Sequence, residues 1–219
     1  MILYSTGVNA RTSIRKKGWS TKGRPCISKG RYDRGGRNTS TVIACSRTAG
    51  ILSFSCQSGS FKRPDFLQFL SQHLIPDIVH EKRRLKQDYL SQSHTLTTQW
   101  DKDYDARMRQ HHYKDVTCLV MDNASIHKGD IVASTIQHTL SSLHASDIHI
   151  ELVYQPPYAP TMHPTEMVNA QMKSLLKRHT HQSVPTKVIQ RTLERDIGRA
   201  LQSITPLNVR GYYNHCGWR

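Results

Sequence analysis

The chain has 219 residues, with 31 Lys or Arg against 16 Asp or Glu, which gives a formal net charge of +15 at pH 7. This length allows a single domain, residues 1–219, with a substantial buried core. The excess of cations favours a polyanionic partner such as DNA over a merely basic surface. No run of about 20 apolar residues is present, so we expect no helix that spans a membrane and no membrane partner.

Three short strands are predicted near the start of the chain. Residues 1–4 are apolar and begin the first strand, although only a few residues of it are evident. Residues 39–46 are rich in β-branched side chains, and residues 51–56 alternate apolar with polar ones. Because Thr48-Ala49-Gly50 separates the last two runs with turn-forming residues, they predict a β-hairpin.

A basic loop, residues 11–38, lies between the first strand and the hairpin. Glycines and aromatic residues are interleaved with its cations, as suits contact with a phosphate backbone and stacking on bases. A solvated basic arm is the alternative, and such an arm would also hold DNA. The cations that we expect to contact DNA here are Arg15, Lys16, Lys17, Lys22 and Arg24.

The middle of the chain predicts one helix and a charged insertion. Pro64 suits the first turn of a helix to about His80, which carries an apolar stripe at helical spacing. Residues 81–115 are strongly polar and predict a solvated helix that continues into a loop. Its acids are interpreted as surface charges, because no apolar frame fixes them as ligands.

The remaining elements alternate between strand and helix. We expect strands over residues 117–121 and 149–154, paired in parallel by a right-handed crossover through a helix over 131–143. Two further helices are predicted over 164–178 and 188–204, the second ending before Pro206. The sum is an α/β fold with a mixed sheet of about five strands flanked by helices.

Two carboxylates stand at the ends of these elements. Asp122 follows the apolar strand in Val120-Met121-Asp122-Asn123-Ala124-Ser125-Ile126-His127, and Glu166 follows Pro156-Pro157-Tyr158-Ala159-Pro160-Thr161-Met162-His163-Pro164-Thr165. An acid at a strand end and an acid at a helix start can converge on one divalent ion. Hard carboxylate ligands of this kind favour Mg²⁺ or Mn²⁺.

The two motifs together resemble the catalytic domain of the mariner-like transposases, members of the DDE superfamily of endonucleases with a ribonuclease H-like (retroviral-integrase-like) fold. The family pattern has a strand ending in Asp-Asn, a nearby His, and a Pro-Pro-Tyr-x-Pro run leading to Asn-Pro-x-Glu. Asp122, Asn123 and His127 fit its first half. Pro164 and Glu166 fit the second half, in which His163 replaces the usual Asn.

The resemblance implies a metal-dependent transposase that cleaves DNA and transfers strands in DNA transposition and integration. Asp122 and Glu166 would be catalytic residues and metal ligands, with DNA as the partner and a homodimer as a compatible assembly. The family's first acid has its counterpart at Tyr4. Because the bridging carboxylate is missing, we expect the chain to be inactive or severely impaired in strand cleavage, and to be an N-terminally truncated relative without a helix-turn-helix module.

Several supporting residues have two interpretations. His127 either orients a ligand or reaches a phosphate, or it is an ordinary surface histidine. Asn123 either orients the junction after the strand or acts directly, and His163 either caps the helix or approaches the metal. Lys173 and Lys177, seven and eleven residues after Glu166, contact DNA or keep their helix soluble.

Two alternatives to an active transposase remain. A domesticated or vestigial protein would use the basic arm to bind nucleic acid without catalysis. A ribonuclease H-like nuclease unrelated to transposition would share the fold but leave the proline-rich run unexplained. The five dispersed cysteines have no zinc-type spacing and predict free thiols in a reducing compartment, nuclear or cytoplasmic, rather than secretion.

Overall fold

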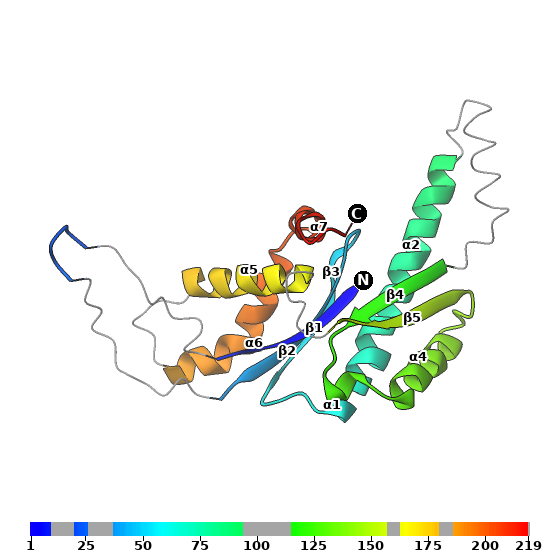
Figure 1. Ribbon diagram of the computed structural model, residues 1–219, viewed down its shortest axis with the longest axis horizontal. Coiled ribbons are helices and arrows are strands. Elements are labelled where there is room, and N and C mark those ends of the chain that lie inside the picture. Colours follow the sequence, from blue (N-terminus) through cyan, green and yellow to red (C-terminus); the bar gives the residue numbers. More distant parts are fainter. Residues whose placement is uncertain (10–19, 26–36, 94–114, 157–162, 180–185, 219) are drawn as a thin grey trace. The chain divides into compact units, whose positions relative to one another are not determined.

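The computed structural model describes residues 1–9, 20–25, 37–93, 115–156, 163–179 and 186–218. These residues group into two compact units, of which the first holds residues 63–157 with Met1 and the second holds residues 2–62 and 158–219. The strands form one mixed five-stranded sheet in the order β3-β2-β1-β4-β5, flanked by helices, as the sequence predicts (Figure 1).

The second unit is built on three antiparallel strands, β1 (Ile2–Val8), β2 (Thr39–Ser46) and β3 (Gly50–Ser58). The predicted hairpin of β2 and β3 is confirmed, and β1 extends four residues beyond the predicted strand. Thr41 to Cys45 of β2 are fully buried. β2 is therefore the centre of this unit, with a hydrogen-bonded strand on each side.

Three helices of the second unit pack on these strands: α5 (Pro164–His179), α6 (Thr186–Gln202) and α7 (Pro206–His215). The first two agree with the prediction, except that Val188 is 45% exposed rather than inward. We did not predict α7. Its Thr205 and Asn208 form a reciprocal capping box, and Pro206 occupies the first turn, which together explain where the helix begins.

Tyr213 anchors α7 to the centre of the strands. Its hydroxyl donates a hydrogen bond of 2.7 Å to the backbone oxygen of Cys45. Burial raises the pKa of the Cys45 thiol to about 12 and also raises the pKa of Tyr213. Both groups are therefore neutral at physiological pH, which suits an interior where an unpaired charge would be costly.

The first unit combines two parallel strands with a long helical segment. β4 (Asp115–Met121) pairs in parallel with β5 (Ile148–Tyr154), and α4 (Asp130–Ser142) connects them, as predicted. α1 (Arg63–Phe69), a π-helical turn (Leu70–Leu74) and α2 (Ile75–Ser93) follow one another without a break. The charged segment thus begins as a helix, as predicted, and that helix is continuous with the preceding one as far as Ser93.

Pro76 explains the π-helical turn. A proline has no N–H and its ring clashes with the carbonyl four residues earlier, so a regular helix cannot continue through this position without adjustment. Widening the preceding turn removes the clash. Phe66, Phe69, Leu70 and Leu74 stay buried through the transition, so burial of the apolar stripe outweighs the irregular backbone.

We predict that Gly50→Ala destabilises the protein by about 2 kcal/mol. Gly50 has φ of +80°, and a Cβ there would lie 2.9 Å from Cα of Pro206, so the substitution combines backbone strain with overpacking. Gly59→Ala is the matched control, because Gly59 has φ of +98° but open space around it. Urea unfolding measures the free energy of unfolding of each variant. Equal decreases for both would contradict a steric contribution at Gly50.

Candidate catalytic and nucleic-acid-binding site

The Asp122 carboxylate is held immediately after β4 by two groups of the following loop. Its Oδ1 accepts a hydrogen bond of 2.9 Å from the Ala124 N–H and lies 2.7 Å from Nδ1 of His127. A carboxylate oxygen accepts, so Nδ1 of His127 is assigned as the donor of this hydrogen bond. The Asp122 side chain is 27% exposed. One oxygen is thus fixed by the protein while the group still reaches solvent.

His127 is buried, so the interpretation as a surface histidine is wrong. Its side chain has no exposed surface, and its ring lies against Phe66 with centroids 4.5 Å apart. Its backbone oxygen accepts a hydrogen bond of 2.9 Å from the Tyr154 hydroxyl. Within the described residues, its Nε2 has no hydrogen-bond partner. These contacts support a role in orienting Asp122.

Asn123 connects the ends of β4 and β5. Its Nδ2 donates a hydrogen bond to the backbone oxygen of Gln155, and the Gln155 N–H donates to the backbone oxygen of Met121 at 3.0 Å. Arg63 donates to the backbone oxygen of Ser125 at 2.7 Å. Hydrogen bonds from three directions therefore fix the loop that follows Asp122, which supports the orienting role expected for Asn123.

Glu166 lies in the first turn of α5 in the second unit and is half-buried. Its N–H donates to the backbone oxygen of His163 at 3.1 Å. His163 therefore stands where the helix begins, and its carbonyl takes part in the first turn. Its side chain is buried, which agrees with a structural role at the helix start, while a role as metal ligand stays a hypothesis.

Tyr4 of β1 lies against His163. The two rings meet edge to face with centroids 5.8 Å apart. The position on β1 where the resemblance expects a carboxylate is thus next to the helix start that carries Glu166. A tyrosine there supplies an aromatic ring and a hydroxyl instead of two carboxylate oxygens.

The predicted DNA-binding residues fall into three groups. Lys173 and Lys177 are half-buried on α5, on the same side of the helix as Glu166 by helical periodicity. Lys22 and Arg24 are exposed in a turn closed by a hydrogen bond of 2.9 Å from Arg24 N–H to the Thr21 oxygen. The others, Arg15, Lys16 and Lys17, lie outside the described residues, as do Pro157, Tyr158 and Pro160 of the second motif.

The carboxylate oxygens of Asp122 and of Glu166 are each of the kind that a hard cation prefers. Asp122 offers a partly exposed carboxylate, and Glu166 offers a second one in the other unit. The bridging acid that the resemblance implies has its counterpart at Tyr4, which carries no carboxylate. The parts of the chain that the structure describes hold no group of three or more His, Cys, Asp or Glu side chains suited to a metal ion.

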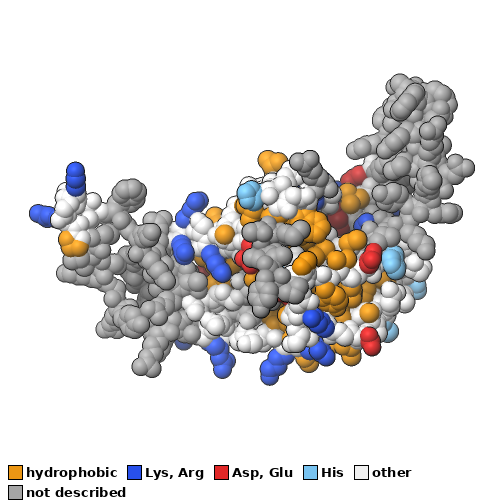
Figure 2. Space-filling view, viewed as in Figure 1, with side chains coloured by type: hydrophobic (Ala, Val, Ile, Leu, Met, Phe, Trp, Pro, Cys, Tyr) orange, Lys and Arg blue, Asp and Glu red, His pale blue; other side chains and the backbone are white. Residues whose placement is uncertain are grey.

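Charge is divided unevenly between the two units. The described residues of the second unit include three acids, Glu166, Glu194 and Asp196, against a much larger number of Lys and Arg. In the first unit the described acids outnumber the cations. Figure 2 shows Lys and Arg side chains over the region of α5 and α6. The second unit is therefore the better surface for a polyanion.

A ribonuclease H-like mixed sheet, with acids after β4 and at the start of α5, defines a class of nucleases and transposases. The model of the family described as DDE superfamily endonuclease matches residues 5–186. The chain therefore belongs to the DDE superfamily endonucleases. No curated protein sequence matches it significantly.

Solved structures of the Mos1 mariner transposase have a similar fold. The paired-end complex with Mg has a TM-score of 0.51 and 14% sequence identity, over 99% of this chain and 52% of that one. A pre-cleavage Mos1 transpososome has a TM-score of 0.48 and 13% identity, over 99% and 55%. The chain thus spans about half the length of these Mos1 chains. None of the described helices is long and apolar enough to cross a membrane.

We predict that His127→Ala lowers the free energy of unfolding by about 3 kcal/mol, because it removes a buried ring from Phe66 and a hydrogen bond from Asp122. His138→Ala is the control, since His138 is exposed on α4 and should change stability by less than about 0.5 kcal/mol. Urea unfolding measures both. Equal, small effects would show that the His127 contacts contribute little.

Proposed function

We propose that this chain is a transposase-derived DNA-binding domain whose strand-cleaving chemistry is impaired. Its membership of the DDE superfamily endonucleases supports an ancestry in metal-dependent DNA cleavage and strand transfer. The observation that supports impaired cleavage is the contact between Tyr4 and His163. It supports the assignment of Tyr4 to the position of the first acid, where this chain has no carboxylate.

The missing carboxylate matters because of the charge that develops in the reaction. In-line displacement at a phosphodiester places negative charge on the attacking and the leaving oxygen, and two divalent ions about 4 Å apart stabilise both when a carboxylate bridges them. The Tyr4 phenol is a poor substitute for this bridge. Asp122 and Glu166 are left to act without it.

We propose Asp122 and Glu166 as the residues that hold a single Mg²⁺ or Mn²⁺ ion. Their oxygen donors suit either cation, and Mos1 complexes have been solved with Mg and with Mn. When bound, such an ion supplies electrostatic stabilisation of phosphate oxygens. His127 and the Ala124 N–H contribute by holding Asp122 Oδ1, so that the orientation of the carboxylate does not depend on the ion.

DNA is the proposed partner. The Mos1 structures are described as paired-end complexes and as a transpososome, and the described residues of the second unit carry the cationic surface that a phosphate backbone needs. The same observations allow the second candidate, a non-enzymatic nucleic-acid-binding protein, and the tyrosine at position 4 favours it. The two candidates differ in whether any cleavage remains.

We expect the wild-type chain not to nick supercoiled plasmid in Mg²⁺ or Mn²⁺, because the bridging acid is absent. Tyr4→Asp should introduce slow, metal-dependent nicking, since it places a carboxylate on β1 beside the start of α5. Adding Asp122→Asn to that variant should abolish it. Agarose gel electrophoresis separates nicked from supercoiled plasmid, and Tyr4→Asn is the control for loss of the tyrosine alone. If the wild-type chain nicks plasmid and Asp122→Asn abolishes that activity, the chain is an active enzyme and the proposed impairment is wrong.

We also expect binding to a 30-base-pair duplex to be non-specific and strongly salt-dependent. Four or more phosphate contacts predict at least about a 100-fold loss of affinity between 50 and 200 mM salt, because each contact releases condensed counterions. Fluorescence anisotropy in EDTA measures this without any metal contribution. An affinity that hardly changes over this range, or that depends on duplex sequence, would contradict the proposal.

A further inference from the structure

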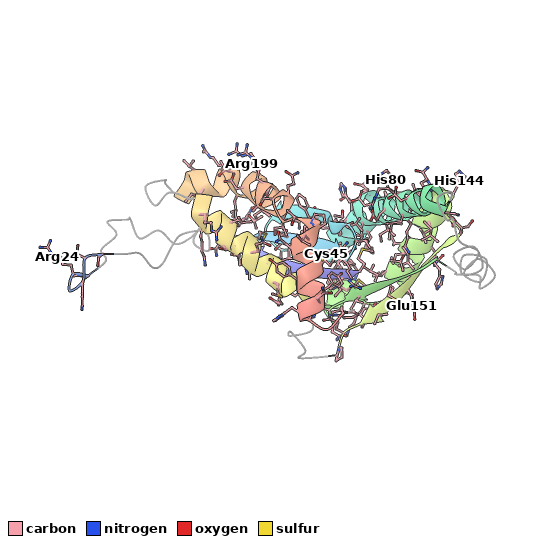
Figure 3. The ribbon with its side chains drawn as sticks, turned by 90° about the horizontal axis from the view of Figure 1, so that it is seen from above. Arg24, Cys45, His80, His144, Glu151 and Arg199 are labelled. Carbon is pink, nitrogen blue, oxygen red and sulfur yellow. The ribbon has the colours of Figure 1, made fainter. Side chains whose placement is uncertain are left out.

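Helix α6 carries a row of three arginines that its predicted apolar pattern does not account for. Arg191, Arg195 and Arg199 recur every fourth residue and are all exposed. The buried residues of the same helix occupy a different side, and they are Ile189, Leu193, Ile197, Ala200 and Leu201. In Figure 3 the Arg199 side chain extends from α6 away from the strands of its own unit.

Asp196 of α6 does not neutralise this arginine row. Asp196 accepts a hydrogen bond of 2.7 Å from the Thr192 hydroxyl. It also lies 3.6 Å from Nε of Arg195, in an ion pair whose side chains are 60% and 35% exposed. An exposed pair at this distance contributes little and is screened by salt. The row therefore keeps most of its positive charge available to a ligand.

We infer that the arginine row of α6 is a phosphate-contacting surface for duplex DNA, separate from the basic loop and from the lysines of α5. This inference rests on the proposed function and names a part of its DNA contact. Four residues of helix rise about 6 Å, so the three arginines extend over about 12 Å. Duplex DNA carries one charge per about 1.7 Å of its axis, so a helix lying along it meets several phosphates.

The chemistry of arginine favours this ligand over an acidic protein. The guanidinium group binds phosphate through two parallel hydrogen bonds. A regular row of such groups matches a regular line of phosphates, whereas acidic side chains on a protein surface seldom recur at such density. The composition of the second unit agrees, because its described cations far outnumber Glu166, Glu194 and Asp196.

The test replaces all three arginines by glutamine and measures the salt dependence of binding to a 30-base-pair duplex in EDTA. We expect the slope of log affinity against log salt to fall by about 3, from the loss of three phosphate contacts, and the Kd at 100 mM salt to rise at least about 10-fold. A triple Arg→Lys variant should keep most of the slope, because the charges remain.

The matched control replaces Lys82, Arg84 and Lys86 of α2 by glutamine. It removes the same number of charges from a helix of the first unit, where Lys82 is half-buried and Arg84 already pairs with Glu81 and Asp88. We expect its slope to stay within about 1 of the wild type. Circular dichroism checks that each variant is folded. If the triple variant does not fold, Arg199→Gln alone replaces it, with an expected change in slope of about 1.

The possible outcomes separate this inference from the proposed function. Wild-type binding without salt dependence would overturn the proposed function itself. The wild type can show a steep salt slope that the α6 variant retains, or that falls in that variant no more than in the α2 control. Either result would overturn the inference about the arginine row and leave the proposed function intact. Binding of poly-glutamate as tight as that of DNA, and lost in the α6 variant, would assign the row to an acidic protein and likewise overturn the inference.

Discussion

The pair formed by Asp122 and His127 is the constraint on which the candidate site depends. A carboxylate at the end of a strand has several accessible rotamers, and ordering it costs conformational entropy. Here the Ala124 N–H and the buried imidazole fix one of its oxygens. The entropy of ordering the Asp122 side chain is therefore lost during folding. A ligand then binds a carboxylate that is already oriented. Preorganisation of this kind is what electrostatic binding sites require.

The hydrogen bonds that orient Asp122 come from its own unit of the structure. The interactions around Asp122 belong to the first unit, while Tyr4 and Glu166 belong to the second. The chain combines an acid that is fixed by hydrogen bonds with a tyrosine in contact with His163.

The sequence predicts most elements because their patterns are local. Alternating and β-branched runs locate β2 and β3, and the apolar run before Asp122 locates β4. α7 escapes prediction because Val209 and Tyr213 alone are too few to form a recognisable stripe, although Thr205, Pro206 and Asn208 mark its start. The same limit applies to the site. Spacing identifies Asp122 and Glu166, but the burial of His127 depends on Phe66, which is distant in sequence.

Tyr154 has a consequence for how variants of this protein are interpreted. It is 37% exposed at the end of β5, yet its hydroxyl supports the loop around His127. A substitution there would resemble the loss of a surface aromatic that stacks on a base, while the actual damage would lie in the interior beside Asp122. Surface accessibility is thus a poor guide to which side chains at this edge of the sheet support the interior.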